Sequence, residues 1–137
     1  MTKRNHFEEQ IQIGVFQHLR ARSMPGVVAW HTPNGGLRSK SEGGRFKAMG
    51  VMAGVPDIIA INNGTVHALE LKHLKGRLSS AQKATLDAME LAGARVAVAY
   101  TLDEALVTLE AWGILRRDKS RSVIHRVPEL TENAEQG

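Results

Sequence analysis

The sequence predicts an α/β fold in which helices cover a mixed β-sheet. Helical periodicity opens the chain and returns twice in its second half, and short runs of β-branched and apolar residues stand between these segments. This alternation of helices and strands is typical of α/β folds. The length of 137 residues fits one domain, which we place at residues 1–115. The polar segment 116–137 is expected to be a loosely ordered tail.

The first predicted element is an amphipathic helix over residues 5–22. The apolar side chains that recur at helical spacing are Phe7, Ile11, Val15 and Leu19. Asn5 is the expected N-cap, and Glu8 and Glu9 would then lie in the first turn, where the helix dipole favours acidic side chains. Met24-Pro25-Gly26 ends the helix.

A short strand and a long loop are expected next. Residues 27–31 are β-branched and apolar, which is typical of a strand. Residues 32–45 hold four glycines, one proline and three basic residues, so we expect a loop, of a length that usually serves function or is disordered. A helical turn over residues 45–52 would end at Gly54-Val55-Pro56.

A β-hairpin is predicted in the middle of the chain. Residues 58–61 form a continuous apolar run, Asn63-Gly64 is a strong hairpin turn, and residues 65–72 form the partner strand. The two strands are therefore expected to be antiparallel neighbours. Alternation along the second strand places Glu70 and Lys72 on one face and His67 on the other.

The remaining elements complete a predicted order of α-β-β-β-α-β-α. Ser79 or Ser80 would cap a helix over residues 81–92, which ends at Gly93. Residues 95–100 form a strand, and a last helix runs from Thr101 or Asp103 to about residue 112.

Composition excludes several classes of protein. The chain has no cysteine, which removes disulfide scaffolds, thiolate zinc sites and cysteine nucleophiles. No apolar run approaches the roughly 20 residues that span a bilayer, and the polar N-terminus is unlike a secretory signal. We therefore expect a cytoplasmic protein with no membrane partner. It has no GxGxxG or Walker A pattern, so no nucleotide cofactor is expected.

The net charge of +4 is unevenly distributed. Residues 1–47 hold eight Lys or Arg and three Asp or Glu, whereas residues 48–115 hold five and seven. A basic patch attracts phosphate, and nucleic acid is its usual partner.

Three charged residues suggest a metal-dependent site. The predicted hairpin brings Asp57, at the start of its first strand, beside Glu70 and Lys72 at the end of its second. Two neighbouring carboxylates repel unless a cation lies between them, and their hard oxygen atoms favour Mg²⁺ or Mn²⁺. A nearby ammonium group can hold an attacking water or stabilise charge on a phosphate. A Glu-x-Lys pair alone, however, is usually a solvated strand face.

Longer motifs around these residues resemble a known family. The sequence GVPDIIAI, followed by HALELK, resembles the metal-binding core of the PD-(D/E)XK nucleases. HTPNGGLRS, KAMGVMAGVPD and ELKHLKGRLSSAQ narrow the resemblance to the VRR-NUC (virus-type replication-repair nuclease) domain, of the compact phage-encoded kind. The resemblance covers roughly residues 6–110 and implies a restriction-endonuclease-like core.

The resemblance also implies roles for individual residues. Asp57 and Glu70 match the metal ligands, with the backbone carbonyl of Leu71 completing the set. Lys72 matches the catalytic lysine, and Gln82 matches a glutamine that orders the lysine or the water.

A glutamate of the first helix reaches the metal in this family, often through water. Glu8 fits the family's E-x-x-x-Q arrangement with Gln12 and is our choice, whereas Glu9 stays open.

The basic loop would face DNA according to the same resemblance. Its glycines let backbone amides approach phosphate, and its basic side chains supply charge. His31 would either touch substrate or pack at the strand end, and His67 is left out of the site. The expected DNA contacts are Asn34, Gly35, Gly36, Arg38, Lys40, Arg45 and Lys47, with Lys75 and Arg77 after the catalytic strand.

The function expected from the resemblance is Mg²⁺- or Mn²⁺-dependent hydrolysis of DNA phosphodiester bonds. The compact viral members act as homodimers on branched DNA, especially four-way junctions, and a phage-encoded protein would work in the bacterial host cytoplasm. Two alternatives stay open: a restriction-type or general-repair nuclease of the same superfamily, and a non-catalytic DNA-binding module.

Overall fold

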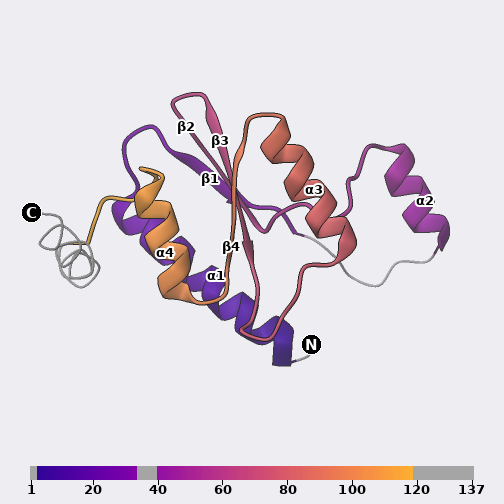
Figure 1. The fold of residues 1–137 in the computed structure, drawn as a ribbon, viewed down its shortest axis with the longest axis horizontal. Helices are drawn as coiled ribbons and strands as arrows, with labels where there is room; N and C mark the ends of the chain where they lie inside the picture. Colours follow the sequence, from indigo (N-terminus) through magenta and orange to yellow (C-terminus); the bar gives the residue numbers. More distant parts are fainter. Residues whose placement is uncertain (1–2, 34–39, 119–137) are drawn as a thin grey trace, which may run out of the picture.

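The computed structural model describes residues 3–33 and 40–118, and it confirms the mixed α/β architecture (Figure 1). None of the helices in these ranges is long and apolar enough to cross a membrane. The elements, in chain order, are α1 (Lys3–Arg22), β1 (Val28–His31), α2 (Lys40–Ala48), β2 (Ile58–Asn62), β3 (Thr65–Leu71), α3 (Ser80–Leu91), β4 (Arg95–Ala99) and α4 (Leu102–Ala111).

The four strands form one sheet in the order β1-β2-β3-β4. The first three strands are antiparallel neighbours, and β4 runs parallel to β3. The hairpin turn between β2 and β3 is the predicted Asn63-Gly64, in which both residues have positive φ angles of 51° and 77°. The pairing of Ile58 with Leu69 sets the register, and this register brings the residue before β2 beside the end of β3.

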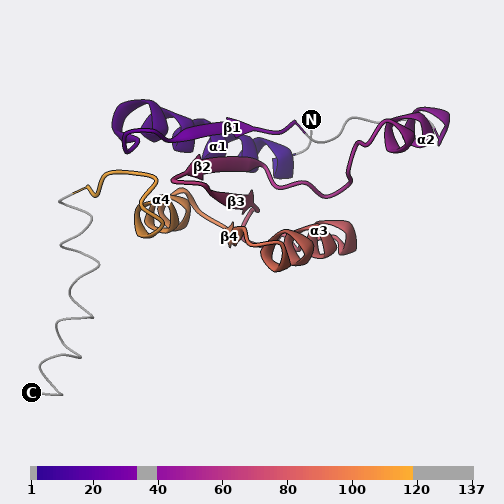
Figure 2. The same cartoon turned by 90° about the horizontal axis from the view of Figure 1, so that it is seen from above.

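Helices cover the sheet on both faces. In Figures 1 and 2, α4 and α3 lie on opposite sides of β4. Helix α1 packs against α4, and the two helices enclose the hydrophobic core with the sheet. Buried residues at the centre of this core include Val15, Leu69, Leu71, Leu106 and Leu109.

Helix α2 is the main departure from the predicted order. We expected a loop over residues 32–45 and a helical turn over 45–52, but residues 40–48 form a helix. Its sequence hides the helix because Gly43 and Gly44 are poor helix formers and no apolar stripe marks a packed face. Figures 1 and 2 show that α2 stands apart from the sheet, beyond α3, so it has no apolar face packed against the core.

The start of the first helix also differs from the prediction. Helix α1 begins at Lys3, so Asn5 is not its N-cap and Glu8 and Glu9 lie beyond the first turn. At its other end, Arg22 binds the start of the predicted tail, because the N–H of Arg116 donates to the carbonyl of Arg22 at 2.8 Å. Residues 119–137 of that tail lie outside the described residues.

Candidate active site

Asp57 and Glu70 meet where β2 begins and β3 ends. The N–H of Leu71 donates to Oδ2 of Asp57 at 2.8 Å, and the N–H of Asp57 lies 3.3 Å from Oε1 of Glu70. The backbone of Asp57 is held from the other side, because Thr32 N–H donates to its carbonyl at 3.0 Å and His31 Nδ1 lies 2.7 Å from it. His31 thus fixes the main chain at Asp57.

Glu70 is buried next to the Asp57 carboxylate, and both features disfavour its ionised form. Only 2 % of the residue is exposed. Burial raises the pKa of Glu70 from 4.5 to about 8, with a further contribution from the neighbouring Asp57 carboxylate, and the nearby Lys72 only partly opposes this rise. A hard divalent cation would satisfy both carboxylates, so this donor set fits such an ion.

Lys72 and Gln82 contact the same oxygen of Glu70. The Nζ atom of Lys72 lies 3.6 Å from Oε2 of Glu70, and Nε2 of Gln82 donates to that oxygen at 2.7 Å. From the resemblance we expected Gln82 to order the lysine or the water. The hydrogen bond found here goes to the glutamate that Lys72 also contacts.

The first turn of α3 fixes the orientation of the Gln82 amide. Ser79 N–H donates to Oε1 of Gln82 at 2.9 Å, and Gln82 N–H donates to Oγ of Ser79 at 3.1 Å, which forms a capping box. Because Oε1 accepts from Ser79, Nε2 faces Glu70. The helix cap thus positions a side chain of the candidate site.

Two residues that were not predicted from the sequence, Gly54 and Thr85, hold the segment before Asp57 against α3. Gly54 has a φ angle of +76°, and a Cβ there would lie 2.4 Å from the carbonyl oxygen of Ala81. Thr85 is buried, and its Oγ1 donates to the carbonyl of Ala53 at 2.7 Å. The glycine before Val-Pro-Asp was the only signal of this contact, and we interpreted it as a helix breaker.

Glu8 is half-buried and Glu9 is exposed. The Oε2 atom of Glu8 is buried and has no hydrogen-bond partner among the described residues. Within residues 3–33 and 40–118, however, no three His, Asp or Glu side chains gather into a metal cluster. The role of Glu8 as a third ligand, direct or through water, therefore stays a prediction.

His67 lies away from these carboxylates. It is buried, its Nδ1 is 3.3 Å from the carbonyl of Ala60, and its ring centre is 5.2 Å from that of Trp112. These contacts agree with its omission from the site.

The predicted DNA contacts fall in three places. Arg45 and Lys47 are exposed on α2, to which Lys40 also belongs, and Lys75 and Arg77 are exposed between β3 and α3. Those outside the described residues are Asn34, Gly35, Gly36 and Arg38.

Comparisons with known proteins agree with the fold. The family model of the VRR-NUC domain matches residues 8–102. A solved structure described as a VRR_NUC domain protein is 23 % identical with a TM-score of 0.63, and the match covers 77 % of this chain and 86 % of that one. A second, described as a VRR_NUC domain, is 18 % identical with a TM-score of 0.51, over 75 % and 94 % of the two chains. Comparison with curated proteins finds no match.

Proposed function

Because this chain belongs to the VRR-NUC domain family, whose members are nucleases of the PD-(D/E)XK type, we propose that it is a divalent-metal-dependent DNA endonuclease that hydrolyses phosphodiester bonds in branched DNA. The observation that carries the proposal is the burial of Glu70 against Asp57, Lys72 and Gln82. A buried carboxylate next to a half-buried one and a lysine suits a cation and a phosphate better than it suits a structural core.

Asp57 and Glu70 would hold Mg²⁺ or Mn²⁺ together with the carbonyl oxygen of Leu71. When bound, the ion supplies Lewis-acid stabilisation of the negative charge that develops on the phosphate. The N–H of Leu71 orients the Asp57 carboxylate from its own strand. The end of β3 therefore orients this metal ligand.

Lys72 has the role of positioning water for attack on phosphorus. Its ammonium group is next to Glu70, so a water held between this group and the phosphate is within reach of both. Gln82 acts indirectly. Its hydrogen bond holds Glu70 in the orientation in which the Glu70 carboxylate contacts Lys72.

The preference for branched DNA and the homodimer belong to the same proposal. Exposed basic side chains on α2 and on the β3–α3 connection supply phosphate contacts that position a duplex without reading its sequence. Resolution of a four-way junction needs two symmetric cuts, and one chain supplies one such site. A two-fold dimer would place two sites on one junction.

A substrate panel tests this function. Linear, flapped and four-way DNA are incubated with Mg²⁺, with Mn²⁺ or with a chelator, and the products are separated on denaturing gels. We expect paired nicks in four-way DNA only when metal is present, and no cleavage by Lys72→Ala. Arg95→Ala is the matched control, because Arg95 is an exposed basic residue at the opposite end of the sheet from Lys72.

The same panel separates the alternatives. Site-dependent double-strand breaks in linear DNA would indicate a restriction-type nuclease. DNA binding without cleavage in either metal would indicate a non-catalytic module, and calorimetry would then show no metal binding that depends on Asp57. Full cleavage by Lys72→Ala would refute the mechanism.

A further inference from the structure

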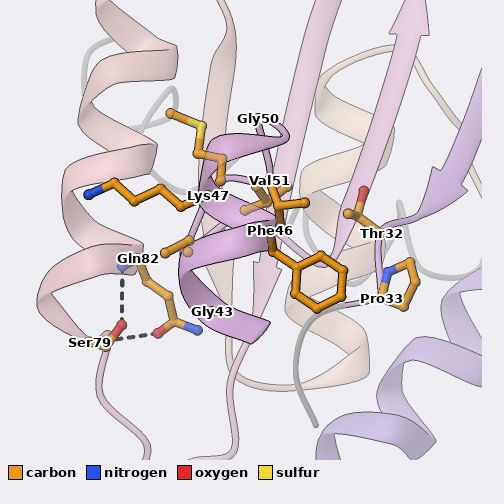
Figure 3. A pocket seen from close by; sticks show the side chains of 13 residues that line it. Thr32, Pro33, Gly43, Phe46, Lys47, Gly50, Val51, Ser79 and Gln82 are labelled. Atoms are coloured by element: carbon orange, nitrogen blue, oxygen red, sulfur yellow. Dashed lines mark hydrogen bonds between the residues drawn. The ribbon is translucent and has the colours of Figure 1, made fainter. Parts of the chain in front are cut away.

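A cavity of about 1060 Å³ lies between α2 and α3, beside the carboxylate pair. Figure 3 shows the Phe46 ring turned toward Pro33, with Gln82 and Ser79 on the side of α3. Thr32, at the end of β1, and Val51, after α2, also line it. Its volume is slightly above the range of about 300–1,000 Å³ that is typical of pockets for small organic ligands.

The cavity adjoins the candidate active site through two of its wall residues. Gln82 donates to the carboxylate of Glu70 at 2.7 Å, and Thr32 N–H donates to the carbonyl of Asp57 at 3.0 Å. A phosphate held at the carboxylate pair would therefore have the cavity as its immediate neighbour. Whatever group is covalently attached to that phosphate is the natural occupant.

The chemistry of the walls is mixed in a way that suits a nucleobase. Phe46, Pro33 and Val51 are apolar, whereas the Ser79 hydroxyl and the Lys47 side chain add polar groups. A nucleobase has two apolar faces, which stack on aromatic rings, and an edge of hydrogen-bonding groups.

We propose that the α2–α3 cavity takes one unpaired nucleobase next to the phosphate that the site cleaves. This inference rests on the proposed nuclease function and deepens it. A base in a continuous duplex is stacked and paired, so its entry requires unstacking, whereas an unpaired base at a branch or flap enters without that penalty. The cavity thus gives a physical reason for selection of branched DNA by a single chain.

The test compares three substrates that differ at one nucleotide. The position of the cut is first mapped on a branched substrate, and the nucleotide beside it is then made paired, unpaired, or unpaired without a base. We expect the wild-type protein to cleave the unpaired substrate about 5- to 150-fold faster than the one without a base, since stacking on an aromatic side chain stabilises a bound base by about 1–3 kcal/mol.

Variants of one aromatic residue connect that difference to the cavity. In Phe46→Ala, the unpaired and base-free substrates should be cleaved at the same rate, and Phe46→Tyr should restore the difference. Met49→Ala is the matched control, because Met49 follows α2, is 67 % exposed and does not line the cavity. Thermal melting of each variant verifies that it folds.

The outcomes separate the two proposals. Cleavage that is equal for the unpaired and base-free substrates in the wild-type protein overturns the cavity proposal and leaves the nuclease in place. Absence of cleavage on every substrate in Mg²⁺ and Mn²⁺ overturns both. A change of molecular mass in Phe46→Ala by sedimentation equilibrium, without a change in substrate preference, would assign the cavity to a second copy of the chain and overturn the proposal.

Discussion

The side chain of Gln82 on α3 donates a hydrogen bond of 2.7 Å to Oε2 of Glu70 on β3, and Lys72 Nζ lies 3.6 Å from the same oxygen. The other oxygen of Glu70 faces the N–H of Asp57. Three residues from different parts of the site therefore set the orientation of one buried carboxylate. Loss of any of these contacts is expected to change the affinity of the two carboxylates for a cation.

Replacement of Gln82 by methionine should reduce cleavage by about 10- to 100-fold, because groups that orient metal ligands have effects of this size. Methionine keeps the side-chain length and removes the hydrogen bond to Glu70. The metal concentration needed for a half-maximal cleavage rate should be higher than in the wild type. That concentration is measured by titration with Mn²⁺ in a cleavage assay.

Ser79→Ala is the matched control for this variant. It removes the hydroxyl that caps α3, at a stability loss of about 1 kcal/mol, but it keeps the Ser79 N–H that holds the Gln82 amide. Its metal dependence should stay close to that of the wild type. If both variants shift the metal titration equally, Gln82 acts through the helix cap and its bond to Glu70 is unimportant.

The stability of the metal-free protein should fall as pH rises from about 4.5 to about 8. The pKa of Glu70 is raised from 4.5 to about 8 in the folded state, so the folded protein binds a proton that the unfolded chain releases in this range. The stabilisation is complete below pH 4.5 and is lost as pH rises to 8. Calorimetric melting in a chelator at several pH values measures it.

Glu70→Gln should remove this part of the pH dependence, because glutamine does not ionise. The variant is expected to melt at a higher temperature than the wild type at pH 9. Added Mn²⁺ should stabilise the wild type increasingly as pH rises to 8 and should not stabilise the variant. A wild-type profile that matches that of Glu70→Gln would show that Glu70 is not buried beside a second carboxylate.

Local sequence signals were sufficient for most of the fold. Asn63-Gly64 fixes the hairpin because both residues accept positive φ angles, and this turn alone predicts that Asp57 approaches Glu70. Ser79 or Ser80 was expected to cap α3, and the structure places the capping box at Ser79. In each case the determining interaction lies within a few residues along the chain.

Long-range contacts could not be predicted in the same way. Nothing near Gly54 in the sequence indicates that the carbonyl of Ala81 packs against it. Helix α2 was missed because its residues follow no apolar pattern, and a cavity between α2 and α3 depends on the relative position of two helices. Such features arise from packing between distant segments, which periodicity does not encode.

Thr85→Val should destabilise the protein by about 1–3 kcal/mol, because the carbonyl of Ala53 loses its hydrogen bond to a buried hydroxyl. Valine has nearly the shape of threonine, so packing changes little. Thr85→Ser keeps the hydroxyl and should recover most of the loss. Urea unfolding measures both variants, and equal stability of the serine and valine variants would contradict the prediction.

Gly54→Ala should reduce both stability and cleavage, because the new methyl group meets the backbone of α3. A Cβ at residue 54 would be 2.4 Å from the carbonyl oxygen of Ala81 and 2.7 Å from the amide nitrogen of Gln82. Neither atom belongs to a flexible side chain, so the first turn of α3 must move. Gln82 moves with it, and its bond to Glu70 lengthens.

Gly113→Ala separates this displacement from backbone strain. Gly113 has nearly the same φ angle, +75° against +76°, but a Cβ there meets nothing within 4 Å. Both variants should lose about 1–2 kcal/mol from the positive φ angle, and only Gly54→Ala should also need more Mn²⁺ for half-maximal cleavage. If the metal titration of Gly54→Ala matches that of Gly113→Ala, the contact between Gly54 and α3 supports the fold and does not position Gln82.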